Sequence, residues 1–293
     1  IELTESFDQA LHNYLVKSNI IEESENIKSY AKAGEGNMNF VMRLTTTESS
    51  LILKQSRDYV NKYPQIAAPI ERIAVEKRFF EEVATDEFLS KVSPAVIVYD
   101  DENHLLVMED LGQGVDYLSL YHEKEKTLSG FEIELLIKFL VRLHGLKPMD
   151  FPSNQAMKQL NHEHIFHFPF LVENGFNLDD VQEGLQAIAL EFKNDEMLKG
   201  AISAVGERYL KSGNTLLHGD CYPGSWLNVD GEVKVIDPEF GFMGDPEFDL
   251  GVMLAHLAIA QAPSQVLETC INKYQSEKKL DQKLLKQYQG IEI

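Results

Sequence analysis

The sequence contains few cysteines, a minority of basic residues and no long apolar run. Its two cysteines, Cys221 and Cys270, are too few for a disulfide framework, which favours a reducing compartment such as the cytoplasm. No run of roughly 18 apolar residues occurs, so no transmembrane helix is predicted. Lys and Arg number 27 against 47 Asp and Glu, and the net charge of −20 argues against nucleic acid or an anionic membrane as a partner.

The remaining composition is that of an ordinary globular protein. The 293 residues are 44% hydrophobic and 25% charged, enough for two lobes with a sizeable core. The first residues, Ile1 to Glu5, are acidic and helix-like, unlike the basic start of a signal peptide. We therefore expect a cytoplasmic protein whose acids lie mostly on solvated helix faces. The sequence leaves its oligomeric state open.

The most informative segment runs from His218 to Glu239 and includes Asp220, Asp237 and Glu239. Asp220 follows His218-Gly219, and Asp237 comes seventeen positions later. Phosphoryl transfer from a nucleotide needs one carboxylate that orients a hydroxyl and accepts its proton, and others that hold Mg²⁺. Asp220 suits the first role, and Asp237 and Glu239 suit the second, because Mg²⁺ prefers hard oxygen ligands.

A hairpin is predicted to bring these acids together. The strand-like stretches around Asp230-Gly231 form a β-hairpin over residues 226–236. Because the two ends of a hairpin lie side by side, the loop with Asp220 is expected next to the turn with Asp237. Pro238 biases Asp237 away from right-handed helical backbone angles, so we expect an extended or turning segment there.

Three segments resemble the aminoglycoside phosphotransferase and choline kinase superfamily, which has a protein-kinase-like fold. Within it, the strongest resemblance is to methylthioribose kinases. The segments occur in the expected order: 34–40 with 51–55, then 107–111, then 218–225 with 236–240. The resemblance implies that Asp220 is the catalytic base and that Asp237 and Glu239 bind the metal. It also implies that Ser225 stands where most relatives have a metal-binding asparagine.

The resemblance also assigns a nucleotide site to the N-terminal part. Gly34 and Gly36 lie between two strand-like segments, and Lys54 follows on the third, as in the kinase arrangement of loop, strand and lysine. Loop N–H groups, that of Asn37 included, and Lys54 would then contact ATP phosphates. In protein kinases the segment after the sheet holds adenine by its backbone, which here implicates Glu109 and Leu111.

A lysine buried in an apolar strand needs an anionic partner. Glu76, near the middle of the helix expected over residues 67–88, is the candidate, although the same helix also carries Glu71, Glu81 and Glu82. The alternative for Lys54 is a side chain that faces water from an edge strand.

The predicted fold class is α+β, a two-lobed protein-kinase-like fold. Residues 1–108 are expected to form an N-lobe with a small antiparallel sheet and a helix, 109–112 a hinge, and 113–293 a mainly helical C-lobe. In the C-lobe, Asp249 opens an apolar helix near Phe248. It is expected to cap this helix or, by the resemblance, to brace the catalytic loop.

The predicted function is transfer of the γ-phosphate of ATP, with Mg²⁺, to a hydroxyl of a sugar-like or amino-alcohol small molecule, 5-methylthioribose among the candidates. Alternatives are an aminoglycoside, choline or fructosamine-type kinase, or a catalytically silent nucleotide-binding regulator. Cys221-Tyr222-Pro223 replaces the Leu-His-Thr of methylthioribose kinases, and residues 244–250 look more like fructosamine kinases. Little room follows Glu239 for a peptide-docking segment, so a small acceptor is favoured over a protein.

Overall fold

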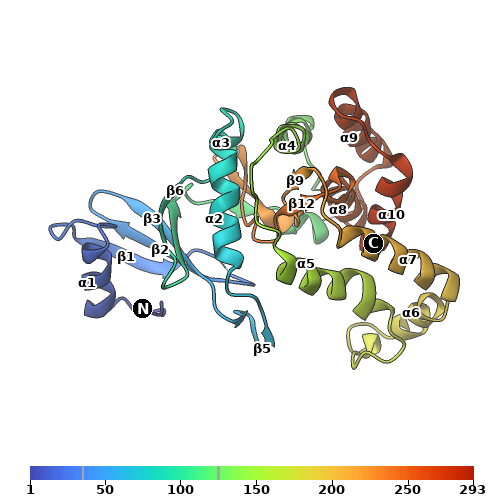
Figure 1. Cartoon of the computed structure of the whole chain (residues 1–293), viewed down its shortest axis with the longest axis horizontal. Helices are drawn as coiled ribbons and strands as arrows, with labels where there is room; N and C mark the ends of the chain where they lie inside the picture. The colour runs from blue at the N-terminus through green and yellow to red at the C-terminus, as the bar shows by residue number, and fades with distance from the viewer. Residues whose placement is uncertain (35, 124–125) are drawn as a thin grey trace. The chain divides into compact units, whose positions relative to one another are not determined.

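The computed structural model describes residues 1–34, 36–123 and 126–293. The chain forms two compact units (Figure 1). Unit 1 comprises Ile1–Tyr117 and Ser225–Gly241, and unit 2 comprises Leu118–Gly224 and Phe242–Ile293. The predicted hairpin segment therefore belongs to unit 1, although unit 2 residues precede and follow it in the chain.

Unit 1 is built on a five-stranded antiparallel sheet. Along strand β2 (Phe40–Thr46), buried and half-buried positions alternate, which is the pattern of a strand that packs one face on a core. Helix α1 (Gln9–Lys17) supplies that core, since Leu11 and Leu15 join Met42 and Leu44 of the strand in one apolar cluster. The strands, in sheet order, are β1 (Ile27–Lys32), β2 (Phe40–Thr46), β3 (Ser50–Gln55), β7 (Leu105–Glu109) and β6 (Val96–Asp100).

The helix predicted over 67–88 is shorter than expected. A small hairpin, β4 (Tyr59–Val60) and β5 (Tyr63–Ala67), precedes it, and the helix α2 spans Arg72–Val83. Residues after it form a separate short helix, α3 (Leu89–Val92). Helix α2 packs on β6 and β7 and buries Ile73, Phe79 and Phe80.

The predicted hairpin over 226–236 is confirmed. Strands β10 (Trp226–Val229) and β11 (Glu232–Val235) pair antiparallel, and β8 (Val115–Asp116) joins the other edge of β10. At the tip, Asp230 and Gly231 have φ values of 52° and 87°. Both lie in the left-handed region, as a tight two-residue turn of this kind requires.

Unit 2 is mainly helical. Helix α8 (Pro246–Ile259) buries nearly its whole surface, as expected of a helix that is apolar all round. A short ladder pairs β9 (Thr215–Leu217) with β12 (Phe242–Gly244). The other helices are α4 (Gly130–Leu143), α5 (Gln155–His162), α6 (Leu185–Lys193), α7 (Glu196–Tyr209), α9 (Ser264–Glu277) and α10 (Gln282–Glu292), with short turns of helix at Leu118–Tyr121, Glu163–His167, Phe168–Phe170, Leu178–Asp180 and Pro223–Ser225.

An aromatic cluster fills the core of unit 2. Tyr209, Phe242, Phe248 and Tyr288 pack ring against ring, with centroids between 4.8 and 6.1 Å apart. These rings come from α7, β12, α8 and α10, so one core joins the elements on either side of the segment that belongs to unit 1.

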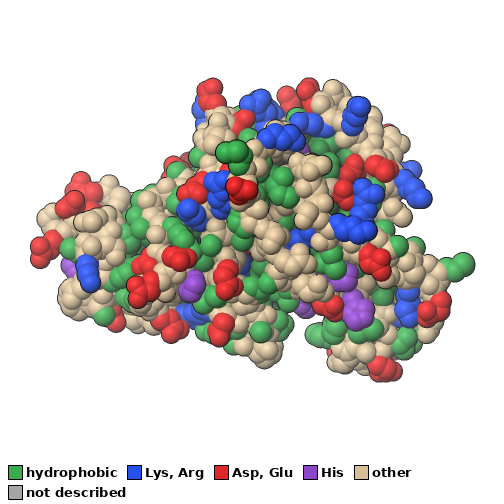
Figure 2. All heavy atoms as spheres, viewed as in Figure 1, with side chains coloured by type: hydrophobic (Ala, Val, Ile, Leu, Met, Phe, Trp, Pro, Cys, Tyr) green, Lys and Arg blue, Asp and Glu red, His purple; other side chains and the backbone are tan. Residues whose placement is uncertain are grey.

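The predicted fold class is confirmed: one unit carries a small antiparallel sheet with a helix, and the other is mainly helical. Of the helices in the described ranges, none has the length and apolar character needed to cross a bilayer. Figure 2 shows Asp and Glu side chains scattered over one face of the molecule among Lys and Arg.

Candidate active site

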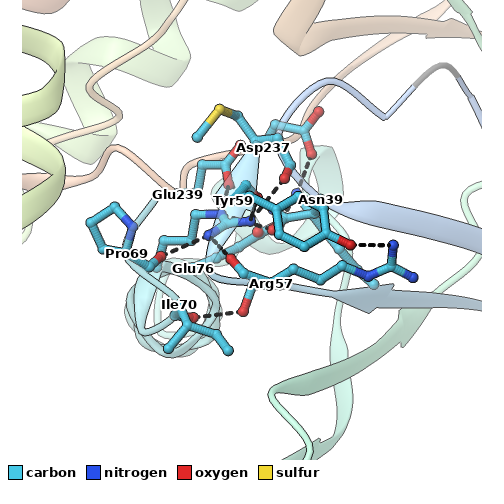
Figure 3. Close-up of polar contacts among 12 residues, drawn as sticks. Asn39, Arg57, Tyr59, Pro69, Ile70, Glu76, Asp237 and Glu239 are labelled. Carbon is cyan, nitrogen blue, oxygen red and sulfur yellow. Dashed lines mark hydrogen bonds and ion pairs between the residues drawn. The ribbon is translucent and has the colours of Figure 1, made fainter. Parts of the chain in front are cut away.

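A buried lysine with two carboxylates forms the centre of the site in unit 1. Figure 3 shows the acids of this site, Glu76, Asp237 and Glu239, beside Asn39. Lys54 Nζ lies 2.8 Å from Glu76 Oε1 and 2.5 Å from Asp237 Oδ1. Strand β3, which carries Lys54, is the central strand of its sheet, so the edge-strand alternative is wrong. Of the four acids considered on the predicted helix, Glu76 is the one that pairs with Lys54.

The lysine is held in its charged form. Burial alone would lower the pKa of Lys54, but the attraction of Asp237, Glu76 and Glu239 outweighs it and raises that pKa. Burial raises the pKa of Glu76, and Asp237 and Glu239 add to the rise against the opposing effect of Lys54. Within the described ranges, no group hydrogen-bonds the second oxygen of Glu76, Oε2. Lys54 is therefore the cation that makes a buried Glu76 tolerable.

Glu239 is anchored from two sides. The Asn39 side-chain amide donates to Glu239 Oε2 at 2.6 Å, and Arg72 Nε lies 3.4 Å from the same oxygen. The Glu239 side chain is 7% exposed. Burial raises the pKa of Glu239, while Lys54 and Arg72 work against that rise. The second acid of the predicted pair thus has a fixed position beside the glycine-rich segment.

Arg72 organises this part of unit 1 and was missed by the sequence reasoning. Its guanidinium donates to the side-chain oxygen of Asn39 at 2.9 Å and to the backbone oxygens of Met38 at 2.8 Å, Arg57 at 2.7 Å and Pro69 at 2.7 Å. The residue is fully buried, and a buried guanidinium needs all of these partners. The sequence feature that could have indicated Arg72 is its position one helical turn before Glu76, on the same face of α2.

The glycine-rich turn requires glycine at position 36. Gly36 has a φ of +56°, and a Cβ there would lie 2.7 Å from the backbone oxygen of Asn39. Gly34 has no such constraint, since nothing lies within 4 Å of a Cβ at that position. Glu35, between them, lies outside the described residues.

The hairpin of β4 and β5 supports this turn from one side. The Asn61 side chain donates to Gly36 O at 3.0 Å, and Lys62 N–H donates to Asn37 O at 2.9 Å. The carbonyl groups of Gly36 and Asn37 are therefore engaged in hydrogen bonds within unit 1. A phosphate would be bound by backbone N–H groups of the turn.

The predicted hinge is tied to the sheet by Asp110. Arg43 donates two hydrogen bonds to its carboxylate, at 2.8 and 2.9 Å, and the Ser50 hydroxyl donates another at 2.5 Å. Burial would raise the pKa of Asp110, but the hydrogen bonds from Ser50 and Arg43 outweigh it and lower that pKa. Glu109 N–H donates to Ala95 O at 2.9 Å, so this N–H is already engaged within the sheet. Leu111, after them, is half-buried.

Asp237 has an unusual backbone. Its φ is +61°, a left-handed value that an aspartate adopts at some cost, and the side chain is 45% exposed. Pro238 disfavours right-handed helical angles at Asp237, and the left-handed turn satisfies that restriction. Ser225 is buried, and its carbonyl accepts a hydrogen bond from Ile236 N at 2.9 Å.

A complete metal cage does not exist among the described residues, where no three His, Cys, Asp or Glu side chains gather for one. Mg²⁺ does not need such a cage, because it commonly takes one or two carboxylates and completes its shell with water and phosphate oxygens. The half-exposed carboxylate of Asp237, with Glu239 two residues later, fits this kind of binding.

The loop with Asp220 lies in unit 2 and is braced by Asp249. The Asp249 carboxylate accepts hydrogen bonds from His218 N at 2.7 Å and Gly219 N at 2.9 Å, and His144 Nε2 lies 3.1 Å from it. The capping role considered for Asp249 is wrong, because α8 begins after Asp245. The half-buried Asp220 directly follows the braced residues.

The structure thus joins Lys54, Glu76, Asp237 and Glu239 in one cluster of unit 1. Asp220 belongs to unit 2. The expected proximity of Asp220 and Asp237 remains a prediction, as do the nucleotide and metal roles of the unit 1 residues.

The antiparallel sheet with its buried lysine and acids is typical of the protein-kinase-like fold. Comparison with known proteins gives the family. The chain belongs to the phosphotransferase enzyme family, which matches residues 30–278. The predicted family is confirmed.

Methylthioribose kinases are among its relatives, which supports the resemblance drawn from the motifs. The enzyme of Bacillus cereus strain G9842 is 28% identical over 243 residues, covering 77% of this chain and 59% of the relative. That of Exiguobacterium sibiricum is 30% identical, covering 78% of this chain and 61% of the relative. The chain therefore spans about three fifths of the length of these relatives.

Solved structures support the fold. A choline kinase from Streptococcus pneumoniae gives a TM-score of 0.59 at 15% identity, covering 97% of this chain and 87% of the other. A spectinomycin phosphotransferase, solved with ADP and spectinomycin, gives 0.57 at 13% identity, covering 99% and 86%. At these identities the likeness concerns the fold alone.

Proposed function

We propose that this chain is an ATP-dependent kinase that transfers the γ-phosphate to a hydroxyl group of a sugar-like small molecule, with 5-methylthioribose as the first candidate. The observation that carries the proposal is the contact of the buried Lys54 with both Glu76 and Asp237. A charged lysine is costly to bury, and its value to a kinase is that it meets phosphate. The methylthioribose kinases among the relatives supply the candidate acceptor.

Nucleotide binding is assigned to unit 1. The N–H groups of the turn at Gly34, Gly36 and Asn37 bind phosphate oxygens, and Lys54, held by Glu76, neutralises their charge. The carbonyl of Glu109 and the N–H of Leu111 hold the adenine edge. These local groups attract a nucleotide despite the net charge of −20.

Asp237 and Glu239 are the proposed metal-binding residues, with Ser225 as a weaker third. When bound, Mg²⁺ neutralises charge on the outer phosphates. Asn39 and Arg72 hold the carboxylate of Glu239 in place for this role. Lys54 keeps Asp237 oriented by a direct ion pair.

Asp220 is the proposed base. It orients the acceptor hydroxyl and takes its proton as the oxygen attacks the γ-phosphate, while the bond from that phosphorus to the β-phosphate oxygen breaks and ADP leaves. Asp249 fixes the preceding backbone through His218 and Gly219, so the carboxylate needs no rearrangement before reaction.

The cytoplasm is the proposed location, because Cys221 and Cys270 are both buried and are not joined in a disulfide.

The testing experiment is an acceptor panel with Mg·ATP, in which ADP formation is measured. The panel contains 5-methylthioribose, a fructosamine, an aminoglycoside, spectinomycin, choline and ethanolamine, and D220N serves as the control enzyme. We expect acceptor-stimulated ADP formation with a sugar-like compound. Turnover of choline or ethanolamine alone would make the protein an amino-alcohol kinase. ATP binding without turnover of any acceptor would favour a silent nucleotide-binding regulator.

A further inference from the structure

Two tyrosines and a histidine of unit 2 form a cluster close to Asp220. The hydroxyl of Tyr121 lies 2.8 Å from His256 Nδ1. The ring of Tyr222 also packs against His256, with a centroid distance of 5.1 Å and an angle of 46° between the ring planes. All three side chains are half-buried. They come from the turn after residue 117, the catalytic loop and helix α8.

The position of Tyr222 is fixed by its neighbours in the catalytic loop. Tyr222 N–H donates to Asp220 O at 3.1 Å. This hydrogen bond links the backbone of Tyr222 to that of the proposed base. The ring folds back over Gly224, where an added Cβ would lie 2.3 Å from the Tyr222 hydroxyl oxygen. Only glycine at position 224 allows this conformation of the tyrosine. The ring is therefore part of the local structure of the loop.

Tyr121 and His256 are both uncharged near neutral pH. Burial lowers the pKa of His256, which keeps the imidazole neutral. Burial raises the pKa of Tyr121, and the nearby Tyr222 and Asp220 add to that rise.

These groups match the chemistry of a sugar ring. A sugar presents C–H faces that pack on aromatic rings and hydroxyl groups that need both donors and acceptors. If the Tyr121 hydroxyl donates to Nδ1 of His256, the neutral imidazole carries its proton on Nε2, where it is a donor. A cationic acceptor would draw instead on carboxylates, and Asp220, whose backbone oxygen accepts from Tyr222 N–H, is assigned to the reacting hydroxyl.

We propose that Tyr121, Tyr222 and His256 form the subsite that binds the ring of a neutral sugar acceptor and directs one of its hydroxyl groups to Asp220. This inference rests on the proposed kinase function. It also gives a role to the Cys221-Tyr222-Pro223 sequence, by which this chain departs from the methylthioribose kinase pattern. Specificity for the sugar would then depend on a residue, Tyr222, at which this chain departs from that pattern.

The test uses the full chain and two variants. Y222L removes the aromatic ring while keeping an apolar side chain of similar length, and Y121F removes only the hydroxyl that meets His256. Y99F is the matched control, because the hydroxyl of Tyr99 donates to Asp101 in unit 1. Circular dichroism and melting temperature confirm that each variant is folded. The KM for the best sugar of the panel and the KM for ATP are measured, and sugar binding without ATP is measured by calorimetry.

We expect Y222L to raise the sugar KM about tenfold or more and Y121F to raise it roughly fivefold, which correspond to losses typical of one packed ring and one hydrogen bond. The KM for ATP stays unchanged in both, and Y99F behaves as wild type. An unchanged sugar KM in both folded variants overturns the subsite while leaving the kinase function intact. Phosphorylation of choline alone overturns the sugar assignment. If no acceptor is turned over, calorimetry decides: sugar binding lost in Y222L supports the subsite, and no binding to wild type contradicts it.

Discussion

Lys54 and Glu76 form an ion pair in which the lysine side chain is 3% exposed and the glutamate side chain is fully buried. Water can compensate neither charge, so Glu76 depends on Lys54, and Lys54 depends on Glu76 and on the other acids nearby. The pair therefore contributes to the folded state as well as to the proposed nucleotide site.

Removing the lysine should destabilise unit 1. We expect K54M to lose about 3–5 kcal/mol of unfolding free energy, the usual effect of leaving one buried charge unpaired. Urea unfolding followed by fluorescence measures this, since Trp226 is the sole tryptophan and is buried in unit 1. K28M, on the exposed side of strand β1, is the control and should change stability by less than about 0.5 kcal/mol. Equal stability of the two variants would mean that the buried pair does not support the fold.

The turn at Gly36 should be required for ATP. In G36A the new methyl group meets the backbone oxygen of Asn39, and alanine must adopt a positive φ. Strain of about 1–3 kcal/mol is expected, which raises the KM for ATP roughly tenfold with the acceptor KM unchanged. G34A is the matched control, since its methyl group meets nothing within 4 Å. A larger effect of G34A than of G36A contradicts this view of the turn.

Asn39 should influence the metal requirement. N39L removes the 2.6 Å hydrogen bond to Glu239 and the partner of Arg72 Nε. We expect the Mg²⁺ concentration for half-maximal turnover to rise several-fold at saturating ATP. N61L is the control, because Asn61 contacts the carbonyl of Gly36 and not Glu239. A metal requirement that stays at the wild-type value in N39L would separate Asn39 from metal binding.

Asp249 should act on turnover and not on nucleotide binding. D249N replaces an acceptor of two backbone N–H groups by an amide that can accept with one oxygen only, which loosens the loop before Asp220. We expect kcat to fall by up to about 100-fold with an unchanged Kd for ATP. D245N is the control, since Asp245 lies four residues earlier and pairs with Arg208 at the surface. Similar kcat values for the two variants would show that the brace is unimportant.

The sequence predicted the parts of the site that depend on local patterns. The hairpin over 226–236 follows from Asp-Gly between two strand-like stretches, and its turn has the backbone angles that this pair favours. The pairing of Lys54 with Glu76 followed from the physical need of a buried ammonium for a partner. Confirming the candidate Glu76 over Glu71, Glu81 and Glu82 required the structure, because a one-dimensional pattern does not fix how α2 is rotated against the sheet.

Other features were not predictable from local patterns. Arg72 resembles an ordinary surface residue of a charged helix, and its buried role depends on carbonyl groups from three separate segments. The small hairpin of β4 and β5 escaped prediction since its strands are too short to show alternation.

D220N and D237N together test the proposed roles of the two aspartates, with kcat measured for the best acceptor and the Kd for Mg·ATP measured by calorimetry. We expect D220N to lower kcat by roughly 100- to 10,000-fold, as for loss of a general base, and to leave the Kd within about twofold of wild type. D237N should weaken Mg·ATP binding as well as turnover. Loss of Mg·ATP binding in D220N, or full turnover in that variant, would contradict the proposed division of roles.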